Sequence, residues 1–190
     1  MNKKRKEGEA RFSKNKIIFL DIDGVLNNDT WMDGDRWNML QAQASSPYTT
    51  RTQMWKPYWD FAPENVTVFN EFLDKTDASI VVSSTWRKGK TPAELEEILF
   101  NNGNVNVIDR IIGKTQDFYV GKRFSQHIPR WKYIKRWMDE NPIDDLTFIV
   151  IDDDPEAWEQ GPQFIWTDPN VGFTKENALH GLTILNGENP

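Results

Sequence analysis

Short apolar runs alternate with amphipathic segments along most of the chain, a pattern that predicts alternating strands and helices. The runs that predict strands are 16–20, 78–84, 146–152 and 163–168, with a short strand within 105–113. Helical spacing of apolar residues predicts helices over 63–76, 91–103 and 130–141, and a short helix beginning at Asp154-Pro155. Continuously apolar strands are typical of a parallel sheet that helices cover on both faces. The pattern therefore predicts an α/β fold in three layers.

The helix over 91–103 has the clearest boundaries. Thr91 stands at the N-cap, Pro92 at the first helical position and Glu94 at the third, which together form a capping box. Asn-Asn-Gly closes the segment at Gly103.

Two segments depart from the alternation. Residues 1–14 are rich in basic side chains, and we expect them to be a disordered tail. Residues 27–60 are polar and have no clean period, but they carry Trp31, Trp37, Trp55 and Trp59. We expect one domain over 15–190, with a short flap or cap inserted after the first strand. The tryptophans of this insertion either pack the flap onto the core, or one or two of them stack on a base, and base stacking contributes about 1–3 kcal/mol.

Charge and composition narrow the function. The 190 residues carry a net charge of −6, although residues 1–16 alone carry +5, so the body is acidic. An acidic body argues against a broad nucleic-acid face. The chain has no cysteines, which excludes disulfides, thiol catalysis and cysteine-ligated zinc. No apolar run is long enough for a membrane span or a signal peptide, so we expect a cytoplasmic protein that does not bind membranes.

Polar residues gather where the predicted strands end. They are Asp21 and Asp23 after the first strand, Ser83, Ser84 and Thr85 after the second, and Asp152, Asp153 and Asp154 after a late strand. Basic residues at or before the helix over 130–141 are Lys122, Arg130 and Lys132. Ligands of parallel sheets bind at the carboxyl ends of the strands, so these groups converge on one crevice.

The acids need a positive partner. Asp21 and Asp23 stand two positions apart, and each makes the other costlier to ionise. A hard cation such as Mg²⁺ binds one or two carboxylates together with water and phosphate. It also neutralises charge on a phosphoryl group during transfer. The pattern therefore indicates phosphate chemistry. We leave Asp154 out of the expected site, because an aspartate just before Pro155 is also well suited to cap a helix.

Four stretches resemble, in order, the motifs of a known family. They are "DIDGVLN", "IVVSSTWR", a basic residue before "IKRWM", and "IVIDDD". The chain resembles the haloacid dehalogenase-like (HAD) phosphohydrolases over roughly residues 16–168. It is most similar to HAD domains of RNA-repair and phage proteins, through "SSTWR", the spacing of Arg130, Ile134 and Trp137, and "TDPNVGFT". The phosphatase half of phage polynucleotide kinase/phosphatase is a more distant likeness.

The resemblance implies a HAD-like Rossmannoid fold and a role for each motif residue. Asp21 would be the nucleophile and Asp23 the general acid and base. Ser84 would hold the phosphate. Arg130 is the first choice for the cation that binds phosphate, with Lys132 and Lys122 as alternatives. The residues implied to hold Mg²⁺ are Asp21, Asp23, Asp152 and Asp153.

The expected function is hydrolysis of a phosphomonoester with Mg²⁺, through an aspartyl-phosphate. The expected substrate is a nucleotide or a nucleic-acid terminal phosphate, and a phosphorylated small molecule is the broader class. Two alternatives stay open, a phospho-acceptor signalling domain and a catalytically silent HAD-like domain that binds nucleic acid.

Two further residues follow the serines in "IVVSSTWR". We expect Trp86 to pack against the protein, and Arg87 to contact either the substrate or an acid of the fold. The sequence does not indicate an oligomeric state.

Overall fold

A single parallel sheet organises the protein. The computed structural model describes residues 12–34, 61–116, 128–159 and 161–187. Its strands lie in the order β3-β2-β1-β4-β5, and every pairing is parallel. The strands are β1 (Ser13–Leu20), β2 (Ala78–Val82), β3 (Ile111–Lys114), β4 (Thr147–Asp152) and β5 (Phe164–Trp166). The α/β fold with a parallel sheet is therefore confirmed.

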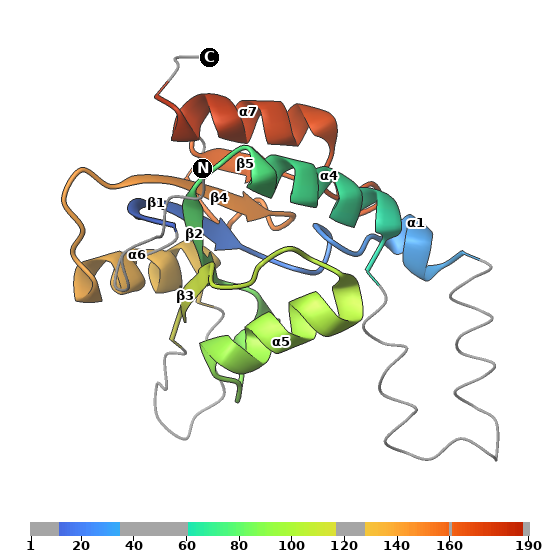
Figure 1. Ribbon diagram of the computed structural model, residues 1–190, viewed down its shortest axis with the longest axis horizontal. Helices are drawn as coiled ribbons and strands as arrows, with labels where there is room; N and C mark the ends of the chain where they lie inside the picture. Colours follow the sequence, from blue (N-terminus) through green and yellow to red (C-terminus); the bar gives the residue numbers. More distant parts are fainter. Residues whose placement is uncertain (1–11, 35–60, 117–127, 160, 188–190) are drawn as a thin grey trace, which may run out of the picture.

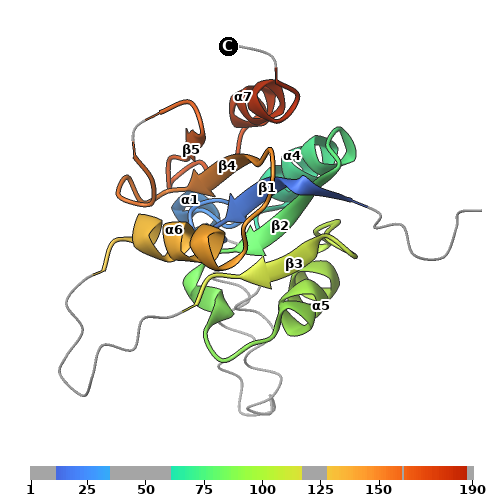
Figure 2. The ribbon, with the colours of Figure 1, turned by 90° about the vertical axis from the view of Figure 1, so that its left-hand side faces the viewer.

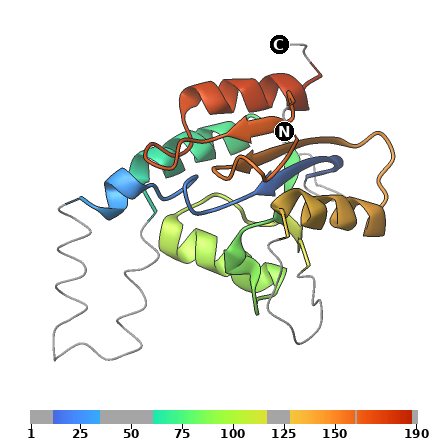
Figure 3. The same ribbon diagram turned by 180° about the vertical axis from the view of Figure 1, so that it is seen from behind.

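Helices cover both faces of this sheet and give the three layers (Figures 1 and 2). Three helices pack on one face, α4 (Pro63–Asp74), α5 (Pro92–Gly103) and α7 (Lys175–Leu185). On the other face lies α6 (Arg130–Glu140). The short helix α1 (Asp29–Met32) follows β1 beyond the carboxyl ends of the strands, as Figure 3 shows from behind.

Alternating residues of β1 enter two different hydrophobic clusters. Ile18 and Leu20 join the cluster beneath α4, α5 and α7, whereas Ile17 and Phe19 join the cluster beneath α6. All four side chains are fully buried. Because neighbouring side chains of a strand point to opposite faces, a strand covered on both sides must be apolar throughout. The two helical layers thus account for the continuous apolar runs in the sequence.

The predicted helices form with small shifts at their ends. Thr91 and Glu94 make the predicted capping box at the start of α5, while Asn104 in a left-handed conformation caps its end. In α6, Ile134 and Trp137 are buried and join the cluster beneath this helix. Pro63 is the first residue of α4, as its place in the sequence indicated.

Two elements differ from the sequence prediction. The segment at Asp154-Pro155 forms a turn instead of a helix, because the Asp154 side chain accepts the N–H of Glu156 at 2.9 Å and closes a tight local loop. The helix α7 was not predicted, although Thr174 and Asn177 form a capping box at its start. Asn is an unusual partner in that motif, where Glu or Gln is expected.

The tail and the insertion are described only in part. The first strand begins at Ser13, inside the stretch 1–14 predicted to be a tail, and residues 1–11 lie outside the described part of the chain. Of the insertion 27–60, residues 27–34 are described. They include α1, whose N-cap Asn28 accepts the N–H of Trp31 at 2.7 Å. Trp37, Trp55 and Trp59 lie outside the described residues.

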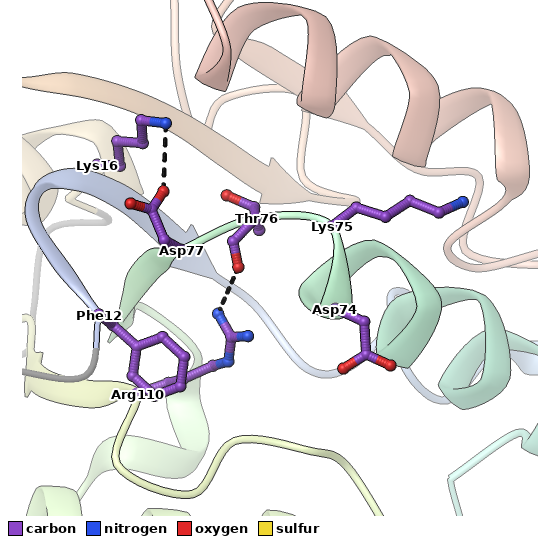
Figure 4. Close-up of a pocket in the computed structure, with 7 residues that line it drawn as sticks. All are labelled: Phe12, Lys16, Asp74, Lys75, Thr76, Asp77 and Arg110. Carbon is purple, nitrogen blue, oxygen red and sulfur yellow. Dashed lines mark hydrogen bonds and ion pairs between the residues drawn. The ribbon is translucent and has the colours of Figure 1, made fainter. Parts of the chain in front are cut away.

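A buried arginine ties elements together at the amino ends of the strands (Figure 4). The Arg110 guanidinium donates to the carbonyls of Leu73, Thr76 and Ala78 at 2.6–3.1 Å. The Phe12 ring lies 3.9 Å from the guanidinium carbon, and both residues line a pocket there. Arg110 satisfies carbonyls at the end of α4, so we assign this pocket a structural role.

Among the described residues, no helix is both long and apolar enough to cross a membrane.

Candidate active site

Pairing of β1 with β4 brings the two acidic motifs together. Leu20 pairs with Ile151, so the next residues, Asp21 and Asp152, lie side by side at the carboxyl edge. The Asp21 N–H continues the ladder by donating to the Ile151 carbonyl at 2.9 Å. Asp21 and Asp152 are buried, and carboxylate oxygens of both lie within 4.8 Å of one from Asp153. Three of the four predicted metal ligands therefore form one cluster.

Arg130, the first residue of α6, lies between these acids. Its guanidinium makes an ion pair with Asp21 and another with Asp152, the latter at 2.6 Å. Loss of hydration favours a lower pKa for Arg130, but the charges of Asp21 and Asp152 outweigh it and raise the pKa overall. Arg130 thus stays charged, and the structure brings the first choice among the predicted cations into the site.

The structure places Lys132, one of the two alternative cations, outside this ion-paired group. Lys132 is exposed on α6, and its ammonium lies 5.4 Å from the centre of the Trp131 ring. Such a distance is typical of a cation–π contact on the helix surface. Lys122 lies outside the described residues.

One guanidinium does not neutralise three clustered carboxylates. Burial raises the pKa of Asp152 well above its ordinary value, and the charge of Asp21 adds to this effect. Burial likewise raises the pKa of Asp153 to about 6, again with a contribution from Asp21. Both directions mean that negative charge is costly here. A set of hard oxygen ligands with excess negative charge fits a divalent cation such as Mg²⁺.

Asp23 lies beside the cluster and has its own partners. Its side chain is not part of the three-acid group. The indole Nε1 of Trp86 donates to Asp23 Oδ2 at 2.8 Å, and Nδ2 of Asn27 donates to Oδ1 at 3.2 Å. Reduced hydration raises the pKa of Asp23, while these two hydrogen bonds act to lower it. Sequence reasoning missed both donors. Trp86 is 63 positions from Asp23, and the sequence does not show that the turn after Asp23 directs the Asn27 amide back to it.

The serines after β2 face different ways. Leu20 pairs with Val82, so Ser83 is level with Asp21. Phe19 and Val81 belong to the cluster under α6, and side chains alternate, so Asp21 and Ser83 lie on the α6 face together. The Ser83 hydroxyl is buried without a hydrogen-bond partner. The Ser84 hydroxyl, in contrast, accepts the backbone N–H of Trp86 at 3.3 Å.

Arg87 has a structural place. It ends the 3₁₀ helix η2 (Thr85–Arg87) and is buried. Its guanidinium donates to the carbonyls of Ser83, Ser84 and Thr115 at 2.8–2.9 Å. It holds the loops after β2 and β3 in register.

Gly24 makes room for an acid of the other motif. Its φ is +68°, a left-handed conformation that favours glycine. A Cβ at this position would overlap the carboxylate of Asp153. Thr167 donates its hydroxyl to the Gly24 carbonyl at 2.9 Å and fixes the turn from the far side. The glycine of "DIDG" is therefore required for the approach of Asp153 to the site.

The "TDPNVGFT" segment packs behind the same turn. The Phe173 N–H donates to the Val25 carbonyl at 2.8 Å. Asn65 of α4 donates to the carbonyls of Val171 and Phe173 at 2.8 and 3.1 Å. This part of the family likeness supports the position of the site and contributes no side chain to the acidic cluster.

The chain matches the model of a known protein family. The family model described as a HAD domain in Swiss Army Knife RNA repair proteins matches residues 17–178. These bounds include both acidic motifs, the serines and α6. No curated protein and no solved structure matches the chain.

Proposed function

The chain belongs to the family of HAD domains of Swiss Army Knife RNA repair proteins, and from this membership we propose that it is a magnesium-dependent phosphatase. The family suggests a phosphatase-type hydrolase. The observation that carries the proposal is the placement of Asp21 beside Asp152, Asp153 and Arg130 at one edge of the sheet. A nucleophile, oxygen ligands for a cation and a fixed guanidinium are the parts that phosphoryl transfer needs.

In the first step, an Asp21 carboxylate oxygen attacks the phosphorus of a phosphomonoester. The new bond joins Asp21 to phosphorus, and the bond from phosphorus to the leaving oxygen breaks. Asp23, in its protonated form, gives its proton to that oxygen, so the product leaves as an alcohol. The result is a phosphorylated Asp21 and an ionised Asp23.

In the second step, water attacks the phosphorus of this acyl phosphate. Asp23 takes a proton from the water as the new bond forms, and the bond between Asp21 and phosphorus breaks. Inorganic phosphate leaves, Asp21 is again a carboxylate, and Asp23 is protonated for the next cycle. The raised pKa of Asp23 suits a group that must hold and release a proton.

Asp21, Asp152 and Asp153 would hold Mg²⁺, as their clustered oxygens and the raised pKa values of Asp152 and Asp153 favour. In family members the backbone carbonyl at the position of Asp23 usually joins them. When bound, Mg²⁺ neutralises negative charge on the phosphoryl group and on the acids.

Arg130 and a serine hydroxyl would bind the remaining phosphate oxygens. We assign the hydroxyl to Ser83 instead of Ser84, because Ser83 is level with Asp21 and has a buried, unpaired Oγ. A buried hydroxyl without a partner is destabilising, and a phosphate oxygen would satisfy it. Ser84 already caps η2.

The proposed substrate is a terminal phosphate of RNA, or of a nucleotide. The family description, which places these domains in RNA repair proteins, supports this choice. A screen with Mg²⁺ that compares 3′- and 5′-phosphorylated oligonucleotides, nucleotides and sugar phosphates would rank the substrates by kcat/KM.

Replacing the nucleophile tests the reaction. We expect Asp21→Asn to lower kcat/KM for p-nitrophenyl phosphate by at least about 10³-fold, since an amide cannot form the aspartyl-phosphate. Asp139→Asn is the matched control, because Asp139 is exposed on α6, and it should retain wild-type activity. Circular dichroism and thermal unfolding would show that both variants fold.

Three outcomes would contradict the proposal. Full activity in Asp21→Asn would remove Asp21 as the nucleophile. A long-lived phosphoprotein after treatment with acetyl phosphate would favour a phospho-acceptor domain. Absence of turnover across the substrate screen, together with tight binding of RNA, would favour a catalytically silent binding domain.

A further inference from the structure

We propose that Trp86 is a positioning residue that orients Asp23 for proton transfer to the leaving group. The inference rests on the proposed function, because it assigns a second residue to the acid of that reaction. Its basis is the hydrogen bond of 2.8 Å from the indole Nε1 to Asp23 Oδ2. The sequence suggested only packing for this tryptophan.

Contacts that do not involve Asp23 hold the indole in place. The Trp86 ring lies 5.6 Å from the buried ring of Phe61, at an interplanar angle of 40°. Its backbone N–H donates to Ser84 Oγ at 3.3 Å, and its carbonyl accepts a hydrogen bond from Lys90 at 3.1 Å. The donor is thus fixed before it meets the acid, as preorganisation requires.

Asp23 itself needs such a partner. Its residue is exposed at the rim of the site, and a carboxylate there would otherwise rotate about its side-chain bonds. Trp86 takes one oxygen and Asn27 takes the other, at 2.8 and 3.2 Å. Together they fix the plane of the carboxyl group.

This arrangement also decides where the proton sits. An indole N–H and an amide N–H can only donate, so each occupies a lone pair of the Asp23 oxygen that it contacts. The proton of Asp23 is left on a lone pair that faces neither donor. From there it moves to the leaving oxygen as the bond from phosphorus to that oxygen breaks. Trp86 neither gains nor loses a proton in the step.

Dependence on the leaving group distinguishes this role from packing. Substituted phenyl phosphates share one ring but differ in how much their leaving group needs a proton, from p-nitrophenol (little) to phenol (much). Trp86→Phe keeps a ring against Phe61 and removes the N–H. We expect it to lower kcat/KM for phenyl phosphate by about tenfold or more, and for p-nitrophenyl phosphate by less than about threefold. Asp23→Asn should show the same selectivity more strongly.

Trp158→Phe is the matched control. Trp158 packs edge-on against Phe148 at 5.2 Å, in the cluster on the α6 face. Its replacement should change kcat/KM for both esters by the same factor, within about twofold of wild type. If Trp86→Phe does not fold, the analogue with benzothienylalanine at position 86 keeps the shape of the indole and replaces its N–H by sulfur, and the same selectivity is expected.

The role of Trp86 would be overturned if Trp86→Phe lowered kcat/KM equally for both esters, or for neither, and Asp23→Asn still affected phenyl phosphate more strongly. That outcome leaves the proposed function intact. Failure of the proposed function is different, because the wild-type protein would then hydrolyse neither ester, and Asp21→Asn would behave like wild type.

Discussion

The two adjacent serines after β2 have different roles because neighbouring side chains at the end of a strand point in different directions. Ser83 is level with Asp21 on the α6 face, while Ser84 caps η2. We expect Ser83→Ala to lower kcat/KM by about 10- to 100-fold, which corresponds to one hydrogen bond to a charged group. Ser84→Ala should cost about 1 kcal/mol of unfolding free energy through the lost cap, with a smaller effect on kcat/KM.

Urea unfolding and steady-state kinetics on both variants would separate these effects. If Ser84→Ala lost the activity and Ser83→Ala kept it, Ser84 would be the residue that binds phosphate, as the sequence indicated. Each variant removes only one hydroxyl, so each is the control for the other.

For individual residues of the site, the sequence predicts the acids better than the uncharged serines and tryptophan around them. The grouping of Asp21, Asp152 and Asp153 could be predicted because the carboxyl ends of neighbouring parallel strands meet at one edge of the sheet. Ser83 and Ser84 could not be separated, because the last paired residue of β2 is not visible in the run "VVSST". The bond of Trp86 to Asp23 joins segments 63 positions apart, and only the folded chain brings them together.

Among the elements, the turn that follows β1 is tightly constrained by its neighbours. Gly24 has a φ of +68°, and a Cβ there would overlap Asp153, whereas Gly89 has a φ of +70° with open space around it. We expect Gly89→Ala to cost about 1–2 kcal/mol of unfolding free energy, from conformation alone. Gly24→Ala should cost about 1–3 kcal/mol more, from the displaced acid, and should lose phosphatase activity.

Urea denaturation of the pair measures the difference between the two costs. Equal destabilisation would show that Asp153 moves away from a new methyl group freely. In that case retained activity in Gly24→Ala would also be expected, and the close approach of Asp153 would not be needed.

The residues at the ends of two helices show why one helix could be predicted and the other could not. The capping box of Thr91 and Glu94 marked α5 without help from tertiary structure. For α7, Asn177 takes the place of the usual Glu or Gln partner, so the start of the helix is hard to see in the sequence. The prediction of a helix at Asp154 was wrong, because an aspartate before proline suits a turn as well as a helix.

For the whole molecule, the acidic cluster predicts how stability depends on pH. The pKa of Asp153 is about 6 in the folded protein, above its ordinary value, so the folded state binds a proton more tightly than the unfolded state does. Without Mg²⁺, this acid therefore lowers stability as the pH rises from about 4 to about 6. We expect Asp153→Asn to gain stability relative to wild type over that range, and the difference to level off above it.

Thermal or urea unfolding of both proteins in EDTA, from pH 4 to pH 8, would measure this difference. Adding Mg²⁺ at pH 7 should raise the stability of wild type more than that of Asp153→Asn, because a bound ion stabilises the state that binds it. A difference that does not change with pH would mean that Asp153 has no raised pKa.

The pairing of β1 with β4 also has a consequence for how the protein is made. Asp21 and Asp152 stand 131 positions apart in the chain, yet they lie side by side only when these two central strands have joined. During translation, Asp21 therefore leaves the ribosome long before Asp152 is synthesised. Contacts between distant segments form late and slowly in folding. Recovery of the proposed phosphatase activity during refolding would thus report when the two central strands pair.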